Sequence, residues 1–91
     1  MSYELEFTDV AIEDIKVLKK TDSKAFSKVE KLLLELMEHP LEGTGKPEPL
    51  KYTLKGLYSR RINKKHRLIY QINNEKITVL IVSVMGDYGD K

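Results

Sequence analysis

Hydrophobic and polar residues follow two different periods in the first part of the chain. Residues 3–7, Tyr-Glu-Leu-Glu-Phe, alternate apolar and acidic side chains, which predicts a short strand with one buried face. Apolar residues then recur at helical spacing in two runs, one over about residues 10–19 and the other from residue 23 to the break at His39-Pro40. The polar sequence Thr21-Asp22-Ser23 can end the first helix and cap the second. Two helices joined so closely predict an antiparallel helical hairpin.

The second half of the chain predicts a loop and then strands. Residues 41–49 hold two glycines and two prolines, which predict a loop without regular structure. Strands are predicted at residues 50–54, 58–63, 67–72 and 77–84, the last two forming a central hairpin. The order of elements predicts one α+β domain over residues 1–91. In it, the helical hairpin packs on one side of a twisted, mostly antiparallel sheet of about four to five strands.

Length and composition exclude several classes of protein. With 91 residues the chain can form one small domain, whose limited core would gain stability from dimerisation or a partner. The absence of cysteine excludes disulfides and thiolate metal sites, and the two histidines stand far apart, so no metal or cofactor is called for. The longest apolar run, residues 79–82, is too short to cross a bilayer, and the first residues lack the basic start of a signal peptide. We therefore expect a cytoplasmic protein that does not engage a membrane.

The net charge of +2 hides a polarised distribution of charge. Residues 1–43 carry six basic and ten acidic side chains, whereas residues 44–67 carry eight basic side chains against Glu48 alone. The basic segment also contains Tyr52, Tyr58 and His66, which can stack on bases. This composition predicts a polyanionic partner, with RNA first. The alternative is a solvated basic edge, because lysines also protect sheet edges from aggregation.

Three motifs in the second half resemble one known family. They are Gly43-x-Gly45-Lys46-Pro47-Glu48-Pro49-Leu50-Lys51, Leu57-Tyr58-Ser59-Arg60-Arg61-Ile62 and His66-Arg67-Leu68-Ile69-Tyr70. With these motifs at this spacing, nearly the whole chain resembles the YoeB (Txe) branch of the RelE toxin superfamily. The resemblance implies a microbial-RNase-like fold and a ribosome-dependent mRNA endoribonuclease, the toxin of a type II toxin–antitoxin pair. It also implies a homodimer and a cognate antitoxin of the YefM/Phd type, whose flexible C-terminal segment covers the active site.

Metal-free cleavage of RNA requires three kinds of group. The neighbouring 2′-OH is the nucleophile, so the site needs a base for its proton, cations for the charged phosphorane and an acid for the 5′-oxygen. The resemblance places the general base at Glu48 and the phosphate-binding arginines at Arg61 and Arg67, with Arg67 counted among the catalytic residues. A planar guanidinium suits this task because it can hold two phosphate oxygens at once. Otherwise Glu48 is a loop charge paired with Lys46 or Lys51.

Other polar residues receive weaker or structural assignments. Lys51 adds a charge near the scissile phosphate, and Lys46 is a weaker candidate for phosphate binding. His66, next to Arg67, is equally expected as a phosphate contact or as a structural residue. Arg60 should face the other side of its strand from Arg61, because neighbours alternate. Tyr70 is expected in the core. The helix acids, namely Glu30, Glu35 and Glu38, are expected to form a solvated face.

One position departs from the family pattern. The family carries a His-Tyr pair near the C-terminus, with the histidine as general acid, and here the pair reads Asp87-Tyr88. Tyr88 fits, but a carboxyl group with an ordinary pKa of about 3.9 is ionised at neutral pH and repels phosphate, unless burial or Glu48 raises that pKa. Loss of the acid should cost a factor on the order of 10²–10⁴ in rate, so we expect a weakened or inactive nuclease. The alternative is a non-catalytic module that binds RNA or antitoxin and regulates its own operon.

Overall fold

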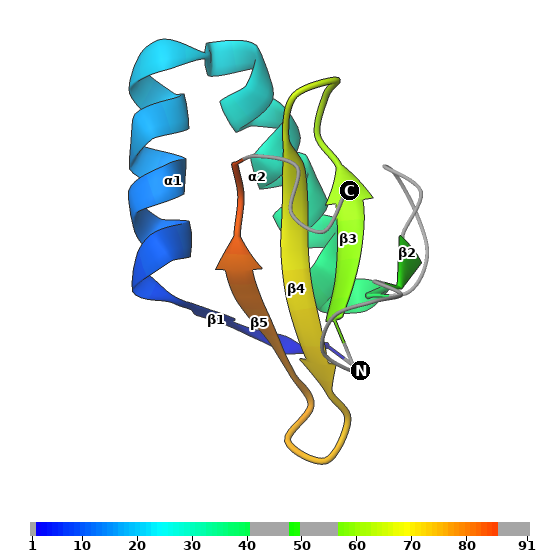
Figure 1. The fold of residues 1–91 in the computed structure, drawn as a ribbon. Coiled ribbons are helices and arrows are strands. Elements are labelled where there is room, and N and C mark those ends of the chain that lie inside the picture. The colour runs from blue at the N-terminus through cyan, green and yellow to red at the C-terminus, as the bar shows by residue number, and fades with distance from the viewer. Residues whose placement is uncertain (1, 41–47, 50–56, 86–91) are drawn as a thin grey trace.

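Two helices and five strands make up the described part of the chain (Figure 1). The computed structural model describes residues 2–40, the backbone of residues 48–49, and residues 57–85. In chain order the elements are β1 (Glu4–Phe7), α1 (Asp9–Thr21), α2 (Ser23–Glu38), β2 (Glu48–Pro49), β3 (Leu57–Arg61), β4 (Arg67–Asn73) and β5 (Thr78–Ser83). The α+β class and the N-terminal helical hairpin are thus confirmed.

Side-chain caps set the boundaries of the two helices. The Thr8 hydroxyl accepts a hydrogen bond from the Ala11 N–H at 3.0 Å and begins α1. Asp22 ends α1 through its own N–H, which donates to the Leu18 carbonyl, and its carboxylate caps α2 by accepting from the Ala25 N–H at 3.1 Å. One residue therefore serves both helices, so the connection is short and the helices lie antiparallel.

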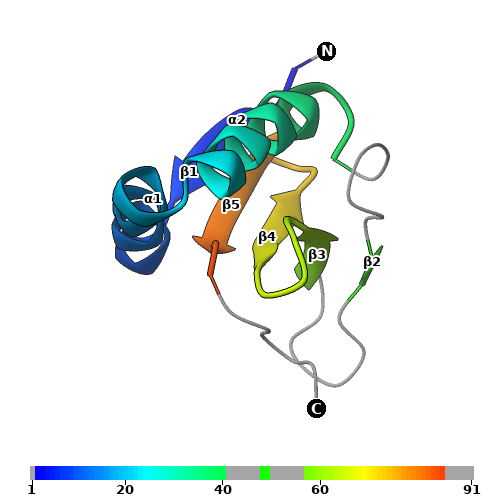
Figure 2. The ribbon, with the colours of Figure 1, turned by 90° about the horizontal axis from the view of Figure 1, so that it is seen from above.

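The sheet has the strand order β1-β5-β4-β3-β2 and is mostly antiparallel. Only β1 and β5 run parallel, because the helical hairpin separates β1 from the rest of the sheet and forms a crossover. The β4–β5 hairpin lies in the middle of the sheet, as the sequence predicted. Both helices lie on one side of the sheet (Figure 2). No helix among the described residues is long and apolar enough to cross a membrane.

The structure corrects one assignment in the second half of the chain. Residues 41–49 were expected to lack regular structure throughout, but Glu48 and Pro49 form a short edge strand paired with Ser59 and Tyr58 of β3. Proline is tolerated there because a residue on an edge strand does not need to donate a hydrogen bond on its outer side. The predicted strand at 50–54 lies outside the described residues.

The core lies between the helices and one face of the sheet. Its buried side chains come from every part of the described chain: Ala11, Leu18, Ala25, Val29, Leu32, Leu36, Ile62, Leu68, Tyr70, Val79, Ile81 and Val84. Tyr70 belongs to this core, as predicted, and its ring stacks on Tyr58 at 5.9 Å between centroids. Burial raises the pKa of Tyr70 above its ordinary value, an effect partly opposed by the hydrogen bond and charge of Arg60.

A charged side chain is fully buried within this apolar layer. Arg60 is 0% exposed, and its guanidinium donates to the Glu35 carboxylate at 3.1 Å, to the Tyr70 hydroxyl at 3.3 Å and to the His39 carbonyl. The Tyr70 hydroxyl in turn donates to the Pro40 carbonyl at 2.7 Å. These bonds join the end of α2 to β3 and β4, so the chain leaves α2 at a defined place.

The Arg60 contacts confirm one prediction and contradict another. Arg60 faces the helices while Arg61 is exposed, as strand alternation predicted. Glu35, however, does not belong to a solvated face: its side chain is only 25% exposed, because it pairs with Arg60. Glu30 and Glu38 are exposed as expected.

Replacing Glu35 with alanine should destabilise the fold by about 2 kcal/mol. The change leaves a buried guanidinium without its carboxylate, and the penalty is below the usual range for buried pairs because Glu35 is partly exposed. Urea unfolding measures the effect. Glu30→Ala is the matched control on the same helix, and it should change the free energy of unfolding by less than about 0.5 kcal/mol. Equal effects of the two substitutions would contradict the buried ion pair.

Candidate active site

The β3–β4 hairpin places two arginines side by side. Arg61 is the last residue of β3 and Arg67 the first of β4, and the two are directly paired in the register. The Ile62 and Asn63 N–H groups both donate to the His66 carbonyl, at 3.0 and 3.3 Å. The Asn63 side chain accepts from the N–H groups of Lys65 and His66, each at 2.8 Å. This short, internally bonded turn fixes where both arginines lie.

The two arginines share the face of the sheet that is turned away from the helices. Arg60 and its partner Leu68 face the helices. Arg61 and Arg67 lie one residue nearer the turn on their strands, so they face the opposite way. Arg61 is exposed and Arg67 is partly buried. Side chains directly opposite in an antiparallel pair start about 5 Å apart. Two guanidinium groups at that spacing can bind the oxygens of one phosphate.

The neighbouring strand brings Glu48 to the same region. The Cα of Glu48 is paired with Ser59, two residues before Arg61 on β3. Two residues of a strand span about 7 Å, so the backbone of the predicted base lies within side-chain reach of the arginine pair. This proximity comes from the β2–β3 pairing, which the sequence did not predict.

The end of β5 reaches the same end of the sheet. Ser83 is paired with Ile69, two residues from Arg67 on β4, so the chain leaves β5 near the arginine pair. Asp87 and Tyr88 follow shortly after β5 in the sequence, but they lie outside the described residues, as do Lys46 and Lys51.

An acid of α1 that the sequence did not single out holds this end of β5. The Asp14 carboxylate accepts hydrogen bonds from the Val84 and Met85 N–H groups, at 2.9 and 3.2 Å. The helical spacing of the sequence indicates that Asp14 faces the sheet. It lies three residues after Ala11 and four before Leu18, which are both buried in α1.

His66 has a mainly structural position. It lies in the β3–β4 turn, is partly buried, and uses both its backbone N–H and its carbonyl to close the turn. Its place next to Arg67 agrees with the predicted neighbourhood of the site, and phosphate contact by its ring stays a prediction.

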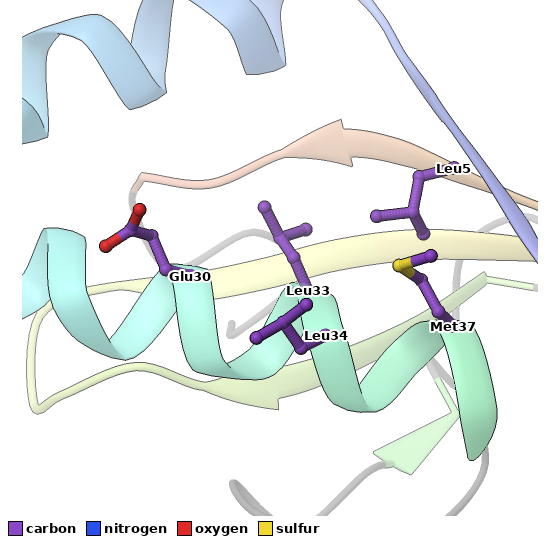
Figure 3. A pocket seen from close by; sticks show the side chains of 5 residues that line it. All are labelled: Leu5, Glu30, Leu33, Leu34 and Met37. Atoms are coloured by element: carbon purple, nitrogen blue, oxygen red, sulfur yellow. The ribbon is translucent and has the colours of Figure 1, made fainter.

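A hollow elsewhere on the surface does not suit phosphate. It lies between β1 and α2, measures about 270 Å³, and is shown in Figure 3. Its lining residues are Leu5, Glu30, Leu33, Leu34 and Met37. An apolar lining with one carboxylate repels a polyanion, so the arginine pair is the better candidate site.

Comparison with known proteins assigns the chain to a family. The family model described as YoeB-like toxin of bacterial type II toxin-antitoxin system matches residues 7–85. The chain belongs to this family. It is therefore a YoeB-like toxin of a type II toxin–antitoxin system, as the three motifs predicted.

Relatives and solved structures agree with the assignment to the YoeB-like toxins. Toxin YoeB of Escherichia coli (strain K12) is 35% identical over 75 residues, which are 82% of this chain and 89% of that protein. A YoeB dimer structure from Staphylococcus aureus is 38% identical, with a TM-score of 0.85 over 97% of this chain and 100% of that one. A YoeB–YefM complex from the same organism is 37% identical, with a TM-score of 0.81 over the same shares.

Arg61→Gln should leave the fold of this YoeB-like toxin intact while weakening RNA binding. Arg61 is exposed, so its substitution should change the free energy of unfolding by less than about 0.5 kcal/mol. Loss of a charged hydrogen-bonding partner for phosphate should lower the affinity for a short RNA about tenfold. Urea unfolding and fluorescence anisotropy measure the two effects.

Lys31→Gln is the control for this pair of measurements, because Lys31 is an exposed lysine of α2 that lies outside the β3–β4 hairpin and the basic segment. It should change the free energy of unfolding little. If Arg61→Gln left RNA affinity at the level of the Lys31→Gln protein, the arginine pair would not be the phosphate site.

Proposed function

We propose that this YoeB-like toxin is a ribosome-dependent mRNA endoribonuclease that needs no metal for the chemical step. The observation that carries the proposal is the direct pairing of Arg61 with Arg67, one strand away from Glu48. Two guanidinium groups that lie side by side can both bind the oxygens of one scissile phosphate.

Each group has a defined part in the proposed reaction. Glu48 removes the proton of the 2′-OH, and the resulting oxygen attacks the adjacent phosphorus. Arg61 and Arg67 stabilise the extra negative charge of the phosphorane, a task in which preorganised cations contribute most. The P–O5′ bond then breaks, leaving a 2′,3′-cyclic phosphate and a 5′-oxygen that must gain a proton.

The weak step is the protonation of the 5′-oxygen. Asp87 stands at the position of the general acid, with Tyr88 next to it, and a carboxylate cannot donate a proton. Lys51 and Lys46 supply further positive charge to the phosphate, with His66 near Arg67. The nuclease is accordingly slow or inactive with Asp87 in place.

Partners follow from the same proposal. The substrate is mRNA on the ribosome, in the cytoplasm. A cognate antitoxin of the YefM/Phd type neutralises the protein, and the protein forms a homodimer. Two similar structures from Staphylococcus aureus support both partners, since one is a YoeB dimer and the other a YoeB–YefM complex.

Asp87→His should raise the rate of mRNA cleavage on programmed ribosomes by a factor on the order of 10²–10⁴, because it restores a proton donor. Single-turnover cleavage measures this gain. Asp90→His is the matched control, with the same exchange three residues further on, and should cut no faster than the unaltered chain.

Two further outcomes separate the proposal from its alternative. Adding Glu48→Gln to the Asp87→His protein should abolish the gain while ribosome binding persists. An Asp87→His protein that binds ribosomes but cleaves no faster would instead favour a non-catalytic module that binds RNA or antitoxin. Asp87 is the observation that favours this alternative, because it stands where the nuclease needs a proton donor.

A further inference from the structure

A second basic region lies where α2 begins next to the β3–β4 turn (Figure 1). The two segments border a hollow of about 340 Å³. Its lining residues are Asp22, Lys24, Ala25, Lys28, Ile62 and Asn63. The sequence placed the two lysines in the acidic half of the chain, and the fold moves them next to the basic half.

Positive charge dominates this hollow and its rim. Lys24 is exposed and Lys28 partly buried, and the turn adds the exposed Lys64 and Lys65. Within the described residues the ion pairs are Lys16–Glu13 and Arg60–Glu35, so none of these four lysines is neutralised there. The one acid of the lining, Asp22, directs its carboxylate to the Ala25 N–H as a helix cap.

The hollow and the arginine pair lie on opposite sides of the β3–β4 turn. Ile62, which lines the hollow, packs in the core with the helices, whereas Arg61, one residue earlier, faces the other way. The Asn63 side chain also holds the turn closed through the N–H groups of Lys65 and His66. The turn, with its exposed Lys64 and Lys65, therefore connects the arginine pair on one side of the sheet with the hollow on the other.

We propose that this hollow binds a backbone phosphate of the messenger strand beyond the scissile phosphate, where the strand has crossed the turn. The inference rests on the proposed function and adds a second subsite to it. Lysines suit this task because they act as mobile point charges that read phosphate and carry no base preference. The messenger is favoured over ribosomal RNA because the hollow borders the same turn that carries the arginine pair, so a strand held at the pair can cross the turn to reach it.

The test compares two double substitutions with the same change in net charge. Lys24→Glu/Lys28→Glu alters the hollow, whereas Lys20→Glu/Lys31→Glu alters exposed lysines that do not line it. The first should lower the affinity for a short single-stranded RNA at least tenfold more than the second. It should also reduce the salt slope of binding by about 0.7 for each phosphate that the protein no longer neutralises. Lys24→Gln/Lys28→Gln should show a smaller loss of the same kind and guards against misfolding of the glutamate variant.

Cleavage kinetics in the Asp87→His protein give an independent readout. Changes in the hollow should raise KM at least tenfold and leave kcat within about twofold, since the lysines do not touch the reacting atoms. Equal effects of the two double substitutions would overturn the subsite, because net charge alone would explain them. The subsite would also be overturned if Lys24→Glu/Lys28→Glu weakened binding to ribosomes without messenger as much as binding to ribosomes with messenger. That result would favour ribosomal RNA as the ligand of the hollow. If Asp87→His cleaves nothing but the RNA affinities differ as expected, the subsite stands and the nuclease assignment falls.

Discussion

The buried guanidinium of Arg60 is the constraint on which the rest of the structure depends. Its bonds to Glu35, Tyr70 and the His39 carbonyl satisfy a charge that would be very unfavourable if left unpaired in the core. A slip of one residue in β3 would exchange the faces of Arg60 and Arg61 and break all of these bonds. The buried arginine therefore selects the register in which its neighbour, Arg61, lies opposite Arg67 on the outer face.

Other polar contacts hold the remaining strand ends at the same end of the sheet. Thr8 donates its hydroxyl proton to the Val82 carbonyl at 2.7 Å, and Asp14 accepts from the two N–H groups that follow β5. Thr8 caps α1 and Asp14 lies in its first half, so the helical layer determines where β5 stops. The helices thus do more than cover the core, since they fix the strand ends from which the candidate site is built.

Local patterns predicted most of the fold but few of its long-range polar contacts. Helical spacing, strand alternation and turn residues sufficed for the helical hairpin, for β3 to β5 and for the inward direction of Arg60. The pairing of Glu35 cannot be seen locally, because its partner lies 25 residues away. Strand β2 cannot be predicted, because two residues that include a proline carry no strand pattern. The pairing of Arg61 with Arg67 follows from the short hairpin. That Lys24 and Lys28 lie next to the β3–β4 turn follows only from the packing of α2, which the sequence does not show. Assignments to Lys46, Lys51, Asp87 and Tyr88 stay predictions from the sequence.

The central claim is that the RNA 2′-OH attacks a phosphate held by the arginine pair. Its most direct test is single-turnover cleavage by the Asp87→His protein of ribosome-bound mRNA with one 2′-deoxy nucleotide on the 5′ side of the cut bond. We expect the ribosome complex to form as with all-ribose mRNA and that bond to stay intact. Cleavage of the 2′-deoxy bond at the all-ribose rate would contradict the claim.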